Sequence, residues 1–371
     1  MKKRNSLGEQ KNTVQAQPID QELCSCRQEE PTDCTMQTKN RKKWSLKRKI
    51  VTASVSVVLV LILAGFFIFQ YLFAGLKTKP ITVQPQELEV DSSVAEKSKE
   101  YKIINIALFG VDSRDYDKNE GRSDSIMILS VDQKNNTLKL TSILRDSKVH
   151  IDGYGEEKIA HAYAYGGPEL AIKTLNDNFH LDIQDYATVN FAGLANVIDA
   201  VGGIDIEITE AERQQININA NSDGLHAETV TSSGLVHLNG AQATAYARIR
   251  NIDSDNARAD RQKKVLACML ENVKTLSVTE YPNLLRTVLP LVETSLSYTD
   301  IIGFAPMLLN ELPLVQHSIP SEEDHAVGGG NPWVWNFDLD AAADRLHTFI
   351  YEDESTESSS DDSSSTDGVS E

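Results

Sequence analysis

"IINIALFGVD", residues 103–112, is an apolar run that ends in a polar loop, a pattern typical of a buried strand. Two strand-like runs follow, "SIMILSVD" (125–132) and "TLKLTSILRD" (137–146), and the residues "QKNN" between them indicate a hairpin. The later segments "DYATVNF" (185–191) and "IDIEI" (204–208) also have the pattern of strands. Together these runs predict a β-sheet at the centre of a folded domain.

Helical patterns are interspersed with these strands. They are "GPELAIKTLNDNF" (167–179), "AGLANVIDAVGG" (192–203), "NGAQATAYA" (239–247), "ARADRQKKVLACMLENVKTL" (257–276), "YPNLLRTVLPLVE" (281–293), "TDIIGFAPMLLNEL" (299–312) and "LDAAADRLHTFIY" (339–351). Strands mixed with helices indicate a single α/β (α+β) domain over residues 101–351, with a central mixed β-sheet flanked by helices. The long polar segment 213–235 is expected to be an exposed loop.

An uncharged run of 27 residues, 50–76, precedes this domain. About 20 apolar residues span the core of a bilayer, so the run predicts one transmembrane helix. Its N-terminal flank, "KNRKKWSLKRK" (39–49), holds seven bases and no acid, and basic flanks stay in the cytoplasm. We therefore expect a single-pass protein of the cell membrane, with a cytoplasmic N-terminus and an extracellular domain.

Composition separates three further segments. Residues 1–49 form a basic tail that is expected to be disordered, and residues 77–100 a short extracellular tether. Residues 352–371 form an acidic, Ser-rich tail that cannot bury enough apolar surface to offset the entropy of ordering. The net charge is −18, and the chain between the two tails carries −16 of it. Such a surface is a poor partner for nucleic acid, so any anion site must be local.

The cysteines agree with this topology. Cys24, Cys26 and Cys34 lie in the predicted cytoplasmic tail, and three ligands are too few for a closed zinc site. Cys268 is the only cysteine in the predicted extracellular part. Its surroundings, "KKVLACMLENV", predict a small core residue of a helix.

Arginine is concentrated in three short blocks of the predicted extracellular part. These blocks hold seven of the ten arginines in residues 77–351. They are Arg114 and Arg122 in "GVDSRDYDKNEGRSDS", Arg145 in "SILRDS", and Arg248, Arg250, Arg258 and Arg261 in "YARIRNIDSDNARADRQ" (246–262). Side chains at the carboxyl ends of strands commonly build sites in open α/β sheets, so blocks that adjoin apolar segments can converge.

Spacing divides the last block into two parts. Arg248 and Arg250 point the same way if their segment is extended, whereas Arg258, Arg261 and Gln262 share one helix face. A guanidinium donates two parallel hydrogen bonds to phosphate, so the convergence of several favours a phosphate site. The alternative is that nearby carboxylates pair with these arginines at the surface; the candidates are Asp115, Asp146, Asp253, Asp255 and Asp260.

Two carboxylates suggest a metal ion beside that phosphate. Asp112 ends the first strand and Asp124 begins the next, so both can face one rim and hold Mg²⁺, or Mn²⁺ as an alternative. A calcium loop is excluded in "DSDNARADRQKK" because Arg258 stands where the loop needs Gly and Lys264 where it needs Glu. Outside the membrane there is no ATP, so a phosphoryl donor must arrive already activated, as a lipid-linked pyrophosphate does.

Seven motifs resemble, in order and spacing, the LytR–CpsA–Psr family of Gram-positive cell-envelope proteins. They are "NIALFGVDSR", "GRSDSIMILSVD", "SILRDS", "KIAHAYAYGGP", "VNFAGLANVIDAVGGIDIEI", "LNGAQATAYARIR" and "DNARADRQ", within roughly residues 101–275. The resemblance implies a phosphotransferase that moves a glycopolymer from an undecaprenyl-pyrophosphate carrier to a peptidoglycan sugar hydroxyl. The glycopolymer would be a teichoic acid or a capsular or rhamnose-type polysaccharide.

The resemblance also implies a role for each matching residue. Asp112 and Asp124 match the acidic pair associated with Mg²⁺, and Arg122 and Arg145 complete the implied catalytic set. The implied pyrophosphate-binding residues are Arg122, Arg145, Lys158, Arg248, Arg250, Arg258, Arg261 and Gln262. Ala160 and Thr244 depart from residues frequent in these motifs, but neither change removes a charged group.

Two other functions stay open at this point, a non-catalytic sensor of polyprenyl-linked intermediates and a polyprenyl pyrophosphate phosphatase. A polyprenyl donor also needs an apolar groove. Its candidate walls are "LANVIDAV" (194–201), "LLRTVLPLV" (284–292) and "IIGFAPMLL" (301–309), each of which could instead be an ordinary core face of a helix.

Overall fold

The structure, a computed structural model, describes residues 46–113, 119, 121–222, 227–277, 279–308 and 313–352. Cys24, Cys26, Cys34, Arg114, Asp115 and the acidic C-terminal tail from residue 353 lie outside this part of the chain. The chain divides into two units, residues 1–60 and 61–371.

Helix α1 (Leu46–Phe73) contains the predicted membrane segment. It begins four residues earlier than the uncharged run, within the basic flank, and ends three residues before the run does. Its window Ser56–Phe73 has a mean hydropathy of 2.4, and only 6% of that window is buried. By length and composition, α1 is the one helix among the described residues that could cross a membrane.

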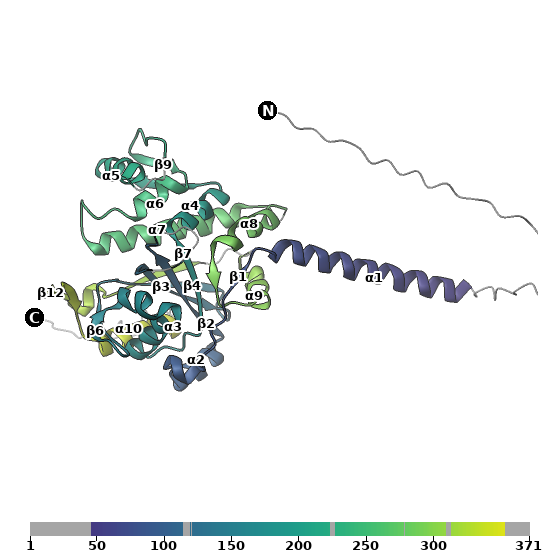
Figure 1. Ribbon diagram of the computed structural model, residues 1–371, viewed down its shortest axis with the longest axis horizontal. Helices are drawn as coiled ribbons and strands as arrows, with labels where there is room; N and C mark the ends of the chain where they lie inside the picture. Colours follow the sequence, from purple (N-terminus) through teal and green to yellow (C-terminus); the bar gives the residue numbers. More distant parts are fainter. Residues whose placement is uncertain are drawn as a thin grey trace, which may run out of the picture. The chain divides into compact units, whose positions relative to one another are not determined.

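The second unit is built on a mixed sheet of seven strands, in the order β1-β10-β7-β2-β3-β4-β11 (Figure 1). The strands are β1 (Lys77–Thr78), β2 (Ile103–Val111), β3 (Ser123–Asp132), β4 (Thr137–Ile143), β7 (Asp185–Asn190), β10 (Glu293–Thr294) and β11 (Leu314–Ile319). Strand β2 runs parallel to β7 and antiparallel to β3, and β3 pairs with β4 as the predicted hairpin. The central mixed sheet is therefore confirmed.

Helices cover both faces of this sheet, as alternation along β2 requires. Phe109 packs on one face in a core with α3 (Ile159–Phe179) and α10 (Leu339–Tyr351). Leu108 packs on the other face, where α7 (Asp255–Thr275) and α9 (Tyr298–Leu308) contribute Leu270 and Phe304. Successive side chains of a strand point to opposite faces, so one strand serves both layers.

A second core lies beside α7. It is formed by α4 (Phe191–Ala200), α5 (Glu210–Ser222), α6 (Gly240–Ala247), α8 (Tyr281–Val288) and a hairpin of β8 (Ile204–Ile208) with β9 (Gly234–Leu238). The prediction of a loop over 213–235 is wrong here, because its first ten residues belong to α5. Ile216 and Ala220, four residues apart, are buried on one face of α5, and Thr209 and Glu212 cap its start reciprocally.

The expectation of a tether over 77–100 is also wrong. Strand β1 joins the edge of the sheet beside β10, and α2 (Ser92–Tyr101) is capped by the Asp91 carboxylate. Leu88 and Val94 are almost completely buried in the core with β2 and α3. Prolines and charges suggested a linker, but these two apolar side chains bury enough surface to dock the segment.

Two small hairpins and a kinked helix complete the surroundings of the site. The hairpins are β5 (Lys148–Ile151) with β6 (Gly155–Lys158), and β12 (Val327–Gly329) with β13 (Val334–Asn336); 3₁₀ turns span Pro85–Leu88, Leu289–Leu291 and Glu322–Asp324. Helix α3 was predicted from residue 167, but it starts at Ile159 and kinks at Gly166 and Gly167. Gly167 has φ of +65°, a conformation that favours glycine. The extra N-terminal turns place Lys158 at the start of the helix.

Candidate active site

Several of the predicted site residues lie at one edge of the sheet, where the carboxyl ends of β2, β4 and β7 meet. Strand β4 runs parallel to β2 because both are antiparallel to β3. Asp112 follows β2, Arg145 comes two residues after β4, and Asn190 ends β7 beside Val111. Open α/β sheets use this edge for ligands, so its polar residues form the rim of a candidate site.

A β-bulge places Asp124 on this rim. Gly110 pairs with Ser125 and Val111 pairs with Ser123, which leaves Asp124 as an extra residue in β3. A bulge re-aims a side chain and is common beside active sites. The Asp124 carboxylate accepts a hydrogen bond of 2.6 Å from the Arg145 guanidinium.

Asp146 is the centre of the charges around Arg145. Its carboxylate accepts a hydrogen bond of 2.7 Å from Lys158 Nζ and lies 3.3 Å from Arg145 Nε. Burial raises the pKa of Asp146, but the hydrogen bond from Lys158 and the charges of Arg145, Lys158 and Arg258 outweigh burial, so the pKa lies below its ordinary value. Two bases and two acids thus interlock within the rim, with the buried Arg258 close by.

A second ion pair lies across the rim at the end of β2. Arg248 caps α6, with its guanidinium 3.8 Å from the half-exposed Asp112 carboxylate and 4.2 Å above the ring of Phe191. The Asp112 backbone N–H donates to the Arg122 carbonyl at 3.2 Å. The Arg122 and Arg250 side chains are exposed. Arg250 flanks the same buried residue, Ile249, as Arg248 does.

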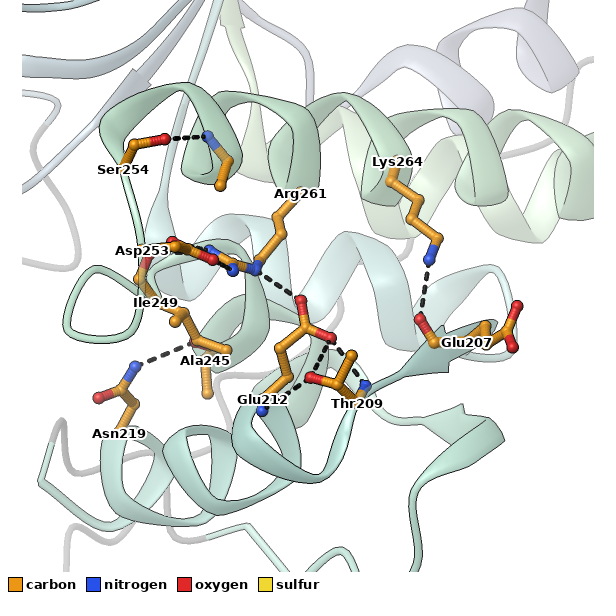
Figure 2. A network of polar contacts seen from close by, with 11 residues as sticks. Glu207, Thr209, Glu212, Asn219, Ala245, Ile249, Asp253, Ser254, Arg261 and Lys264 are labelled. Carbon is orange, nitrogen blue, oxygen red and sulfur yellow. Dashed lines mark hydrogen bonds and ion pairs between the residues drawn. The ribbon is translucent and has the colours of Figure 1, made fainter.

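Arg261 also lies between two carboxylates, but these are Glu212 and Asp253 rather than the carboxylates of the rim (Figure 2). Its Nε donates to Glu212 at 2.8 Å, and its two terminal nitrogens donate to Asp253. Burial lowers the pKa of Arg261, but these two carboxylates outweigh it and raise the pKa. Arg261 therefore follows the alternative to phosphate binding, because it pairs with local carboxylates. Asp260 pairs with Lys263 at 2.9 Å.

An apolar cavity of about 220 Å³ lies between the sheet and the helices α4 and α7. Gln262 lines this cavity. Phe191, whose ring lies under the Arg248 guanidinium, also lines it. The remaining lining residues are Leu108, Phe109, Gly110, Ser125, Met127, Ala187, Thr188, Val189, Asn190, Leu194, Val197, Ala247, Val265, Leu266, Met269 and Val292.

Two of the three segments predicted as walls of the apolar groove contribute residues to this cavity. "LANVIDAV" contributes Leu194 and Val197, and "LLRTVLPLV" contributes only its last residue, Val292. Among the described residues, none of "IIGFAPMLL" lines the cavity. The sequence reasoning missed the α7 face of Val265, Leu266 and Met269. Its signal was the apolar pair Val265 and Met269, four residues apart on the helix that also carries the arginines.

Two carboxylates of the rim, Asp112 and Asp124, are the predicted ligands of a metal ion. No group of three or more His, Cys, Asp or Glu side chains is arranged to hold a metal among the described residues. Mg²⁺, however, is commonly bound by one or two carboxylates plus waters and phosphate oxygens. Asp112 and Asp124 stand on adjacent strands at one edge, so a phosphate ligand could complete such a site.

The model of the LytR_cpsA_psr family matches residues 72–347 of the chain. The chain belongs to the LytR–CpsA–Psr family. A relative from Bacillus anthracis, named polyisoprenyl-teichoic acid–peptidoglycan teichoic acid transferase TagU, is 34% identical over 259 residues, which are 68% of this chain and 80% of the relative. The match to the family model extends the resemblance, which was seen over residues 101–275, almost to the end of α10.

Solved structures of family members share the fold. TagT bound to LI-WTA aligns with a TM-score of 0.56 and 25% identity, over 67% of this chain and 90% of that one. TagT with bound octaprenyl pyrophosphate lipid aligns with a TM-score of 0.52 over 67% of this chain and 90% of that one. At 23% identity, this second likeness supports the fold alone.

Proposed function

We propose that the chain transfers a glycopolymer, in the first place a teichoic acid, from an undecaprenyl-pyrophosphate carrier to a sugar hydroxyl of peptidoglycan. The observation that carries this proposal is the position of Phe191. Phe191 lines the apolar cavity, and its ring also lies under the Arg248 guanidinium. One ligand can therefore place an apolar chain in the cavity and an anion at the rim, as a polyprenyl pyrophosphate requires. A capsular or rhamnose-type polysaccharide would use the same chemistry.

Family membership makes the chain an enzyme, and the charges suggest how it works. The acceptor hydroxyl oxygen would bond to the phosphorus attached to the glycopolymer, and its proton would pass to a base. The bond from this phosphorus to the bridging oxygen would break, and polyprenyl phosphate would leave. Arg145, Lys158 and Arg248 can neutralise charge on the phosphoryl and leaving oxygens, which is the main protein contribution in phosphoryl transfer. The lowered pKa of Asp146 keeps its carboxylate ionised to hold Lys158 and Arg145 in place.

The proposal includes Mg²⁺, with Mn²⁺ as an alternative, held by Asp112 and Asp124. The ion would supply positive charge to the pyrophosphate oxygens. Asp124 lies 2.6 Å from Arg145 and Asp112 lies 3.8 Å from Arg248, so an ion held by these carboxylates and the two guanidiniums would act on the same bound anion. The exposed Arg122 and Arg250 stay in the proposal as residues that could contact the donor, whereas Arg261 would support the site through α7.

The proposal also includes a membrane anchor. A polyprenyl carrier resides in the bilayer, and α1 is apolar over a length that spans one. The basic flank before α1 favours a cytoplasmic N-terminus, which leaves the domain outside with the carrier and peptidoglycan.

Transfer of radiolabelled lipid-linked teichoic acid to peptidoglycan oligomers tests the proposed function. We expect Arg145→Ala and Arg248→Ala to slow transfer by about 10²-fold or more, as for the loss of a donor to developing charge. Arg213→Ala is the matched control, because Arg213 pairs with Glu210 on α5, away from the rim. If the two rim variants transfer as fast as the parent and the control, the site is wrongly assigned.

A further inference from the structure

The hairpin β12–β13 presents an aromatic surface that the proposed function does not use. Trp333, in its turn, is 41% exposed, and its ring meets Trp335 edge to face with centroids 5.0 Å apart. The Trp333 ring covers Gly328, where a Cβ atom would lie 2.4 Å from it. The glycine therefore allows the indole to lie flat on the hairpin, with its other side toward solvent.

This aromatic pair costs the fold some stability. The Trp335 indole N–H is buried, and no hydrogen-bond partner for it exists among the described residues. An unpaired buried donor is unfavourable, and an apolar side chain would avoid that cost. Exposure of Trp333 adds apolar surface to water at the same place. Stability alone therefore does not account for two tryptophans on this hairpin.

The hairpin is joined directly to the rim. The Trp335 backbone N–H donates to the Asp146 carbonyl at 2.9 Å, and Trp335 forms a parallel bridge with Ser147. The carboxylate of the same Asp146 binds Lys158 at 2.7 Å. One residue thus connects the aromatic pair with the cations proposed to hold the pyrophosphate. Figure 1 shows β12 on the same side of the domain as β6, the strand that ends at Lys158.

The direction of phosphoryl transfer decides which substrate would lie there. The attacking and leaving oxygens lie roughly in line with the phosphorus between them. The cavity proposed for the leaving lipid is on the face of the sheet that carries Leu108, under α4 and α7. Lys158 begins α3, which covers the opposite face. With the lipid in that cavity, an acceptor in line with the leaving group would approach from the opposite side, where the hairpin is attached.

We propose that Trp333, supported by Trp335, is a binding platform for the glycan strand of the acceptor peptidoglycan. The C–H face of a pyranose would pack on the exposed indole, as apolar surface packs on aromatic rings elsewhere. This inference rests on the proposed function for the identity of the acceptor. It adds the place where the acceptor is held, on the hairpin whose Trp335 backbone N–H donates to the Asp146 carbonyl.

The platform can be tested by measuring glycan binding in a calorimetric titration of the full chain in detergent. The ligands are peptidoglycan oligosaccharides that carry no stem peptides. We expect Trp333→Ala to weaken glycan binding by about two- to tenfold, the range of an aromatic contact, and Trp333→Tyr to stay close to the parent. Tyr154→Ala is the matched control, because Tyr154 is 52% exposed and stacks on Tyr165 at the far end of the β5–β6 hairpin. Near-parent binding by Trp333→Tyr would show that the position tolerates exchange without loss of the fold.

The outcomes separate this inference from the proposed function. Unchanged glycan binding by Trp333→Ala, or an equal loss in Tyr154→Ala, overturns the platform even if the parent transfers teichoic acid. A loss of affinity for the lipid-linked donor with unchanged glycan binding also overturns it, because the platform would then hold the donor. Glycan binding that depends on Trp333 supports the platform even if the parent shows no transfer, and in that case only the proposed reaction fails.

Discussion

Asp146 is the residue on which the charges of the candidate site depend. It accepts a hydrogen bond from Lys158, approaches Arg145, and carries the hairpin of Trp335 on its carbonyl. Its side chain is 8% exposed, so water cannot replace these partners. Removal of one member of a buried ion pair leaves an uncompensated charge, which is more costly than the pair is favourable.

Asp146→Asn is expected to lower the free energy of unfolding by about 3 kcal/mol at neutral pH. The pKa of Asp146 is lowered on folding, so its contribution is present above the ordinary carboxyl pKa of 3.8 and is lost as the pH falls through the folded value. Denaturant unfolding of parent and variant at pH 7, and again well below pH 3.8, measures both effects. The difference between the two proteins should shrink at acid pH; a difference that grows there would contradict the assignment.

Arg261 and Arg248 are expected to differ in what they support. Arg261→Ala would leave Glu212 and Asp253 without their shared cation, so we expect the free energy of unfolding to fall by about 3 kcal/mol. Arg248 is more exposed, so Arg248→Ala should change stability by less than about 1 kcal/mol while transfer is lost. Parallel unfolding and transfer assays on both variants check this. A stable Arg261→Ala protein that binds pyrophosphate poorly would return Arg261 to the phosphate site.

Helix α7 contributes to the candidate site with side chains that point in three different directions. Arg258 contributes charge near Asp146, Arg261 ties the helix to α5 through Glu212, and Leu266 lines the apolar cavity. An α-helix has 3.6 residues per turn, so side chains three or four residues apart point in similar but not identical directions. Such side chains can therefore contact different neighbours. The helix therefore joins the second core to the sheet and holds one wall of the cavity.

Leu266→Gln is the test of that wall. A buried amide without partners is unfavourable, so a polar side chain in the cavity should reduce binding of a polyprenyl chain severalfold. Mass spectrometry of lipid that co-purifies with the protein measures this. Leu235→Gln on β9 is the control, because Leu235 is 76% exposed and is not among the cavity residues. Equal lipid content in parent and Leu266→Gln would argue against the cavity as the lipid site.

Five strands, β2, β3, β4, β7 and β8, and most helices could be predicted from sequence because their apolar residues recur at the period of the element. The hairpin of β3 and β4 and the helix α7 are examples. The other strands among the described residues were not predicted, and most of them are only two to five residues long. Burial could not be predicted for α2 and α5, because α2 presents only one and α5 only two deeply buried apolar residues within a polar segment. For the site, spacing identified the arginines but not their partners. The separation of Arg261 from the rim depends on Glu212, 49 residues away in the chain.

At the scale of the whole molecule, the described domain begins almost at the end of α1. Phe73 is 6% exposed and packs against Tyr298, and Arg286 donates to Tyr71 at 2.6 Å. Strand β1 and α2 then belong to the domain, so no long linker stands between the apolar helix and the fold. With α1 in a bilayer, the proposed catalytic domain would work close to the membrane surface, where a polyprenyl carrier presents its pyrophosphate.

In the proposed reaction, the bond between the two phosphates of the carrier breaks and the glycopolymer keeps its own phosphate. The most direct measurement follows both phosphorus atoms, in a lipid-linked teichoic acid labelled differently at each phosphate and incubated with the full chain, Mg²⁺ and peptidoglycan. We predict that the sugar-side phosphate becomes covalently bound to peptidoglycan and the lipid-side phosphate stays as polyprenyl monophosphate. Release of the labels as inorganic phosphate, or recovery of both in the intact donor, would contradict the claim.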